Sequence, residues 1–172
     1  FRDMGPRDPY AAAAAQAVET GAMSAVNGRF RPDDPVSPVE AAQFCARTGV
    51  DCLAVSVGTA HGVYTVRQPK VDFDRLEAIN RLTDTPLVLH GGSGVPSGMV
   101  ARAAQMPTGG VSKVNIATDL ELEMLKVVGR EGHLTEAELN GYPEEMTEKS
   151  REAVRILVED KITNYLLSKG RA

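Results

Sequence analysis

The sequence predicts an α/β fold with a parallel sheet, and three observations support this prediction. Short apolar runs alternate with helical patterns after residue 37, which is the arrangement of βαβ units. Each run ends in glycine-rich or polar sequence, as expected where a buried parallel strand leaves its sheet. The 172 residues are 42% hydrophobic and 24% charged, which is enough apolar sequence for one domain with a core.

The first 36 residues are the least regular part of the chain. An alanine run predicts a helix from Ala11 to about Thr20, and Gly21 is placed to end it. The turn signal Asn27-Gly28 and the polar residues after it predict an exposed loop.

A regular pattern begins at Ser37. Ser37-Pro38-Val39-Glu40 combines an N-cap, a proline at the first helical position and a capping-box glutamate, and Gly49 closes this helix. We then expect a strand buried on both faces at 52–57, a helix at 73–82, a strand at 86–89, a helix at 97–105, a strand at 113–116 and a helix at 120–128. A polar connection with a helical piece at 135–139 leads to a long amphipathic helix at 145–167. We expect this last helix to pack on the outside of the α/β domain or on a partner subunit.

Charge and cysteine content exclude several classes of protein. A net charge of −4 without a basic cluster argues against a nucleic-acid-binding protein. No apolar run reaches the ~20 residues of a membrane span, and no signal peptide is visible. Cys45 and Cys52 form no C-x-x-C pair and are interpreted as buried thiols of a reducing compartment, so the expected location is cytoplasmic.

Two of the three histidines follow predicted strands, and each precedes a glycine. In α/β folds the active site lies beyond the carboxyl ends of the parallel strands, and imidazole is a common ligand of zinc. His61 and His90 are therefore predicted to be two ligands of a single divalent metal ion. The alternative is two unrelated histidines held by local hydrogen bonds. His133 has no strand context and is expected on the surface.

The segments after the second and third predicted strands offer groups suited to an anion. Gly91-Gly92-Ser93-Gly94 supplies backbone N–H donors and a hydroxyl, although such a segment is also typical of a plain tight turn. Asn115 to Asp119 opens a helix whose N-terminus favours an anion, and Thr118 or Asp119 as a simple N-cap is an equally good explanation. Tyr64 and Arg67 follow His61 in a loop, where they either line the mouth of the site or have no special role.

Three stretches carry a resemblance to a known family: TGVDCLAVSVGTAHGVY, PLVLHGGSGVP and SKVNIATDL. Together they resemble the class II, metal-dependent ketose-bisphosphate aldolases, which are the fructose- and tagatose-bisphosphate aldolases. They come in the family's order and spacing, as its sixth, seventh and eighth barrel strands, and the resemblance runs from about Ser37 to Leu125. It implies the last part of a (β/α)8 TIM barrel. Residues 1–128 are then a partial barrel, in which 1–36 match poorly and 37–128 are the last three βα units, and residues 129–172 are a C-terminal helical extension.

The resemblance assigns roles residue by residue. His61 resembles the zinc-binding histidine after strand six, and His90 resembles the one after strand seven. The family binds the phosphate of dihydroxyacetone phosphate at the positions that are here Gly62, Gly91, Gly92 and Ser93. It holds the oxygens and phosphate of the same substrate at the positions that are here Asn115, Ile116, Ala117 and Thr118.

The implied function is reversible cleavage of a ketose 1,6-bisphosphate, of fructose or tagatose, to dihydroxyacetone phosphate and glyceraldehyde 3-phosphate. One Zn²⁺ per site binds the ketose carbonyl and hydroxyl oxygens as a Lewis acid and stabilises the enediolate. Some members add a monovalent cation, Na⁺ or K⁺, beside the glycines. The implied partners are a small-molecule sugar bisphosphate and further copies of the chain in a homodimer or homotetramer, with neither nucleic acid nor membrane.

The sequence departs from the family in one important respect. The third zinc histidine and the proton-donating aspartate belong to a strand-three motif of the form H-x-D-H, which these residues lack, so no catalytic residue is assigned. Because a complete barrel has about 250 residues, we expect this chain to be the carboxy-terminal portion of a longer protein. Val18-Glu19 is a candidate remnant of the strand-five segment, which carries a glutamate in the family.

Two other functions stay open at this point. A non-catalytic descendant would keep the glycine-rich segment as a sugar-phosphate-binding module. A related metal-dependent barrel lyase would act on another phosphorylated ketose. Binding of dihydroxyacetone phosphate without turnover would identify the module, and a panel of aldehyde acceptors would identify the other lyase.

Overall fold

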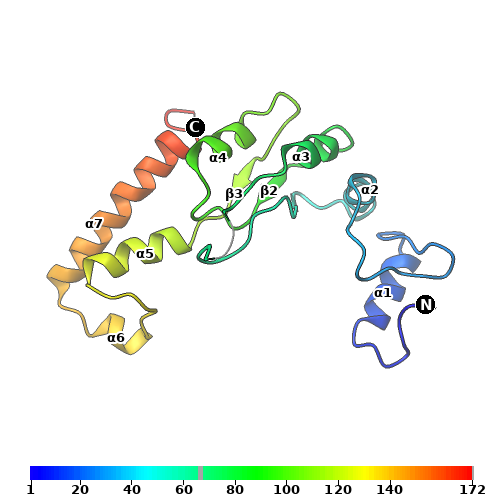
Figure 1. Cartoon of the computed structure of the whole chain (residues 1–172), viewed down its shortest axis with the longest axis horizontal. Helices are drawn as coiled ribbons and strands as arrows, with labels where there is room; N and C mark the ends of the chain where they lie inside the picture. The colour runs from blue at the N-terminus through cyan, green and yellow to red at the C-terminus, as the bar shows by residue number, and fades with distance from the viewer. Residues whose placement is uncertain (66–67, 172) are drawn as a thin grey trace.

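A small parallel sheet lies at the centre of the molecule, for which the computed structural model describes residues 1–65 and 68–171 (Figure 1). Its strands β1 (Leu53–Ala54), β2 (Leu87–Leu89) and β3 (Lys113–Val114) lie in the order β1-β2-β3. Both neighbouring pairs are parallel. The predicted parallel sheet is confirmed, and within the described residues it is open rather than closed into a barrel.

Helices connect the strands, as parallel pairing requires. The helix α3 (Phe73–Asn80) joins β1 to β2, and α4 (Ser97–Ala104) joins β2 to β3. The helix α3 ends two residues before the predicted boundary, and Leu82 is exposed. The third strand is also shorter than predicted, because pairing with β2 ends at Val114.

The strand β1 corrects the prediction of a strand buried on both faces. Val55 and Val57 are buried, whereas Ala54 and Ser56 are exposed. This alternation arises because only one face of the segment packs against the hydrophobic core, to which Val55 and Val57 belong; β1 is also an edge strand, paired only with β2. The central strand β2 is buried at each of its residues, as predicted. A groove of about 540 Å³ lies beside β1, between it and the helix α2 (Pro38–Thr48), and is lined mostly by apolar side chains.

The hydrophobic core lies between the sheet and the helices α3 and α4. Its fully buried side chains come from the strands, the connecting segments and the end of the chain, and they include Val57, Val71, Leu76, Leu87, Leu89, Val100 and Tyr165. This core therefore spans the chain from the first strand to the last helix, and no residue before Leu53 belongs to it.

The N-terminal part forms α1 (Ala11–Glu19) and α2 (Pro38–Thr48), which Figure 1 shows at one end of the molecule. The capping box of α2 is confirmed: the Ser37 hydroxyl accepts from the Glu40 N–H, and the Glu40 carboxylate accepts from the Ser37 N–H. Gly49 ends this helix in the left-handed conformation. Val18 and Glu19 are helical, so this candidate remnant of the strand-five segment does not form a strand here; the preceding alanines favour helix over strand.

The C-terminal part consists of α5 (Thr118–Val127), α6 (Glu136–Asn140), α7 (Glu144–Asp160) and a final π-helical turn, η1 (Lys161–Tyr165). Figure 1 shows α5 and α7 lying side by side, with α6 in the connection between them. The predicted long terminal helix is thus confirmed, with its last turn widened. It packs on α5, and its π-helical end packs on α4.

The structure bears on the expected membrane spans and on the two cysteines. No helix within the described ranges is long and apolar enough to cross a membrane. Cys45 is buried as predicted, but Cys52 is exposed because it precedes the edge strand instead of lying within a covered one. Arg67, considered for the mouth of the site, lies outside the described residues.

Candidate active site

The candidate site lies at the carboxyl ends of the three strands, where their following loops meet. A cavity of about 460 Å³ opens there. Eight of the ten residues predicted for the site line it, together with Val114: they are His61, Gly62, Gly91, Ser93, Asn115, Ile116, Ala117 and Thr118. His90 and Gly92 are not among the residues that line the cavity. The parallel sheet brings the three segments together because all of its strands end at the same edge.

The two histidines lie next to each other across the β1 and β2 loops. Their ring centroids are 5.3 Å apart and the rings are nearly perpendicular, at 83°. His61 is exposed, whereas His90 is half-buried. The Asn115 amide nitrogen lies 3.2 Å from His90 Nε2, so the third strand contributes a contact that orients this imidazole.

The Tyr64 hydroxyl joins the two loops that carry the histidines. It accepts the Ala60 N–H at 2.8 Å and contacts the carbonyl oxygens of Ala60 at 2.9 Å and Gly91 at 3.1 Å. Ala60 precedes His61, and Gly91 follows His90. The Thr59 hydroxyl adds a second link by donating to the His90 carbonyl at 2.7 Å. Side-chain hydroxyls thus set the spacing of the two imidazoles through the backbone.

Two glycines allow the loops to approach closely. Gly91 has a φ of +63°, and a Cβ there would lie 2.2 Å from the Ala60 carbonyl oxygen. A Cβ at Gly92 would lie 2.6 Å from a Val114 methyl group. Gly92 is also held by its N–H, which donates to the Asn115 carbonyl at 3.0 Å. Gly92 therefore acts in the packing of the loop and does not face the cavity.

Several residues that line the cavity have backbone N–H groups available to a ligand. In the described part of the chain, no hydrogen-bond acceptor is found for the N–H groups of Gly62, Gly91, Ser93, Ala117 and Thr118. Two of these belong to the N-terminus of α5, where the helix dipole adds positive potential. Such a collection of donors suits a phosphate or another oxyanion.

The start of α5 differs from the prediction of a plain N-cap at Thr118 or Asp119. Ala117 occupies the cap position and offers no side-chain acceptor. The Ser93 hydroxyl, from the loop after β2, accepts the Asp119 N–H at 3.1 Å and takes the place of a local cap. This hydrogen bond joins the start of α5 to the loop after β2.

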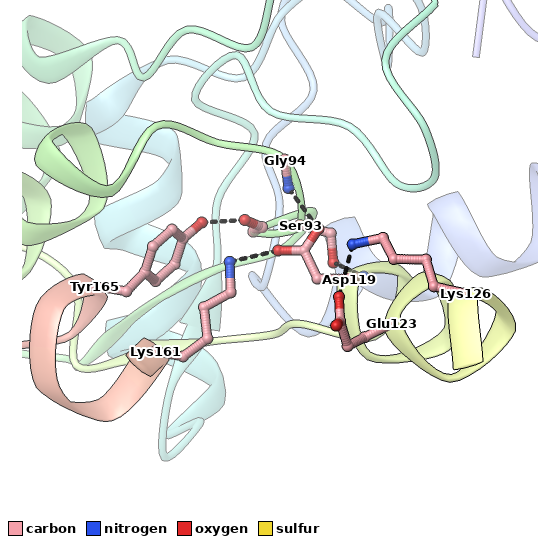
Figure 2. A network of polar contacts seen from close by, with 8 residues as sticks. Ser93, Gly94, Asp119, Glu123, Lys126, Lys161 and Tyr165 are labelled. Carbon is pink, nitrogen blue, oxygen red and sulfur yellow. Dashed lines mark hydrogen bonds and ion pairs between the residues drawn. The ribbon is translucent and has the colours of Figure 1, made fainter. Parts of the chain in front are cut away.

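Sequence reasoning missed the groups that support this loop from behind. Asp119 accepts the Gly94 N–H at 3.0 Å and pairs with Lys161, and the Tyr165 hydroxyl donates to the Gly92 carbonyl (Figure 2). The sequence pattern predicts only that Lys161 and Tyr165 lie on an amphipathic terminal helix. A tyrosine within the apolar face of that helix was the one available signal, because its hydroxyl needs a partner when buried.

The distance between the rings of His61 and His90 suits two ligands of one metal ion. Two imidazoles bound to one tetrahedral zinc have ring centres about 5 Å apart, close to the separation found here. No group of three or more histidine, cysteine, aspartate or glutamate side chains that could hold a metal occurs among the described residues. His133 does not join the pair: it is exposed, and its Nδ1 contacts Glu121.

The carboxyl ends of the strands of a parallel sheet are the usual place of the ligand site in α/β proteins, and backbone N–H donors there suit an anion. The sequence matches the class-II fructose-bisphosphate aldolase family over residues 13–171. The chain belongs to this family.

Solved structures agree with that assignment. The YdjI aldolase from Escherichia coli K12 shares 33% sequence identity with this chain, at a TM-score of 0.63, over 80% of this chain and 47% of that one. A protein from Coccidioides immitis, described as a candidate fructose-1,6-biphosphate aldolase, shares 24% identity and the fold, at a TM-score of 0.58, over 83% of this chain and 48% of that one. The chain thus spans about half the length of these two proteins.

Proposed function

We propose that this chain supplies the zinc and phosphate side of a class II aldolase site, in which His61 and His90 are two ligands of one Zn²⁺. The reaction is the reversible cleavage of fructose or tagatose 1,6-bisphosphate to dihydroxyacetone phosphate and glyceraldehyde 3-phosphate. The three strands correspond in this proposal to the last three of the barrel. The observation that carries it is the pair of imidazoles, 5.3 Å apart, at a cavity lined by free backbone N–H groups.

The residues of the chain have distinct tasks in this proposal. Gly62, Gly91, Ser93 and Thr118 offer N–H groups to the substrate phosphate, and the Ser93 hydroxyl keeps a proton to donate while its oxygen accepts from Asp119. Asn115 and Tyr64 hold the two imidazoles in place. Zinc, when bound, supplies Lewis-acid polarisation of the ketose carbonyl. A monovalent cation beside the glycines is part of the same proposal.

Zinc titration of the chain tests the metal assignment. His61→Ala and His90→Ala are each expected to reduce the Zn²⁺ affinity at least about 100-fold, because each variant keeps only one of the two imidazole ligands that this chain supplies. His133→Ala is the matched control, since its imidazole is exposed and contacts only Glu121 in the described structure. Calorimetry measures the three affinities. Equal affinity of the wild type and the His61→Ala variant would exclude His61 as a ligand.

One observation favours a second function, a sugar-phosphate-binding module without turnover: among the described residues the histidine pair has no third metal ligand. Dihydroxyacetone phosphate binding and cleavage of both ketose bisphosphates, each with and without EDTA, distinguish the two functions. Cleavage that EDTA abolishes supports the aldolase. Binding without cleavage supports the module, and cleavage that survives EDTA excludes the metal-dependent reaction.

A further inference from the structure

The C-terminal helix reaches the loop that follows β2. Tyr165, in η1, is only 2% exposed and is the largest fully buried side chain among the described residues. Its ring belongs to the hydrophobic core, while its hydroxyl donates to the carbonyl oxygen of Gly92. The tyrosine therefore has two separable roles, one of packing and one of hydrogen bonding. Seventy-three positions separate the two residues along the chain.

Lys161 supports the same loop through Asp119. Its ammonium group pairs with the Asp119 carboxylate, and the two side chains are only 15% and 18% exposed. The ammonium also lies 4.2 Å from the centroid of the Tyr165 ring. The second oxygen of Asp119 accepts the Gly94 N–H at 3.0 Å. Figure 2 shows Lys161, Asp119 and Tyr165 gathered around the Ser93–Gly94 segment.

Each residue of the segment 92–94 is consequently held by at least one hydrogen bond from Tyr165 or Asp119. Gly92 is held through its carbonyl by Tyr165, Ser93 through its hydroxyl by the Asp119 backbone, and Gly94 through its N–H by the Asp119 carboxylate. A segment with two glycines has large conformational freedom on its own. These anchors remove that freedom and leave the Ser93 N–H, among the described residues, without an acceptor.

The electrostatic setting keeps the Tyr165 hydroxyl in its donating form. Burial, together with the nearby carboxylate of Asp119, raises the pKa of Tyr165 well above its ordinary value. The hydroxyl therefore stays protonated and remains a donor. Lys161 and Asp119 compensate each other, which a largely buried charge requires.

We infer that Tyr165 and Lys161 are positioning residues of the candidate active site: the C-terminal helix preorganises Gly92–Gly94 to receive the phosphate group of the substrate. This inference rests on the proposed function, because it takes the phosphate from there. The inference assigns the C-terminal helical extension a role in binding the substrate phosphate. Neither residue touches the substrate, and both act through the loop.

Tyr165→Phe is the decisive variant, because it keeps the ring in the core and removes only the hydroxyl. Its affinity for dihydroxyacetone phosphate, measured by calorimetry on the zinc-loaded chain, is expected to fall roughly three- to tenfold, the effect of one lost hydrogen bond. The Zn²⁺ affinity is expected to stay unchanged, since the two histidines do not depend on Tyr165. Tyr10→Phe is the matched control, because Tyr10 is 73% exposed.

Lys161 is tested by a pair of variants. Lys161→Met is expected to weaken binding of dihydroxyacetone phosphate at least as much as Tyr165→Phe, and Lys161→Arg is expected to restore most of it by keeping the charge beside Asp119. Lys126→Met is the control, because Lys126 forms an exposed pair with Glu123 on the surface of α5. Circular dichroism identifies any variant that has lost its fold.

Amide hydrogen exchange separates failure of the inference from failure of the proposed function. The Gly94 N–H is expected to exchange faster in Tyr165→Phe than in the wild type, with or without ligand. Unchanged exchange at Gly94, or unchanged affinity for dihydroxyacetone phosphate in a wild type that binds it, overturns the inference. A wild type that binds neither Zn²⁺ nor dihydroxyacetone phosphate overturns the proposed function, and the exchange rates alone then decide whether Tyr165 holds the loop.

Discussion

Gly91 and Gly49 have the same left-handed backbone in different surroundings. Their φ values are +63° and +65°, but a Cβ would lie 2.2 Å from the Ala60 carbonyl oxygen at Gly91 and would meet nothing within 4 Å at Gly49. Gly49→Ala is therefore expected to lower the free energy of unfolding by about 1 kcal/mol, from backbone strain alone. Gly91→Ala is expected to lower it by at least about 3 kcal/mol, because the loop carrying His61 must move. Urea denaturation measures both, and equal losses would contradict the close approach.

Tyr64 links the residues next to both histidines, so its hydroxyl is expected to matter for metal affinity. Tyr64→Phe removes the contacts with Ala60 and Gly91 and leaves the ring in place. If His61 and His90 bind zinc, the Zn²⁺ affinity should fall about tenfold, as for other groups that orient metal ligands. Calorimetric titration checks this, with Tyr10→Phe as the exposed control. A variant that binds zinc as tightly as the wild type would show that Tyr64 has no part in setting the ligand spacing.

Among the secondary-structure elements, α2 has an ionisable cap whose contribution depends on pH. The Ser37 backbone N–H, followed by the Ser37 hydroxyl and Arg31, lowers the pKa of Glu40 from 4.5 to about 2. Because the folded-state pKa is the lower one, the ionised carboxylate stabilises the helix fully above pH 4.5. This stabilisation is lost as the pH falls from 4.5 towards 2.

Glu40→Gln is therefore expected to lower the free energy of unfolding by about 1 kcal/mol at pH 7, and by progressively less as the pH falls below 4.5. Urea denaturation at pH 7, 4 and 3 follows the difference. Glu145→Gln is the control, since that carboxylate is 80% exposed in its pair with Lys149. A difference that stays constant down to pH 3 would show that the cap does not depend on the charge of Glu40.

At the scale of the whole molecule, the two ends contribute unequally to the core. Residues 1–36 place no side chain in the core cluster, whereas Tyr165 and Leu166 pack into it from the other end. Removal of residues 1–36 is expected to change the free energy of unfolding by no more than about 1 kcal/mol. Removal of residues 161–172 is expected to lower it by at least about 3 kcal/mol, the usual effect of deleting a large buried aromatic side chain.

Thermal and urea unfolding of the two truncated chains checks this asymmetry. The chain 37–172 loses the Arg31–Glu40 pair but keeps the Ser37–Glu40 capping box of α2. If removal of residues 1–36 unfolds the protein, the N-terminal helix has a structural role that the core does not reveal. If removal of residues 161–172 has no effect, the anchoring role inferred for Tyr165 is also wrong.

Local signals were sufficient for the order and type of most elements. The capping box at Ser37, the left-handed Gly49 and the apolar run of β2 each depend on neighbouring residues, and each is found in the structure. The position of His61 and His90 after two parallel strands is also local information. Their approach to each other follows from the sheet, since both strands end at one edge.

The family, the parallel βαβ arrangement and most of the residues that line the cavity can be identified from sequence patterns. The tertiary structure alone decided that β1 is an edge strand, that Ser93 serves as the missing cap of α5, and that Tyr165 holds Gly92. The physical reason is the range of the interactions. Caps and hydrophobic periods act over a few residues and are visible in a sequence, whereas these hydrogen bonds join residues that only the packed core brings together.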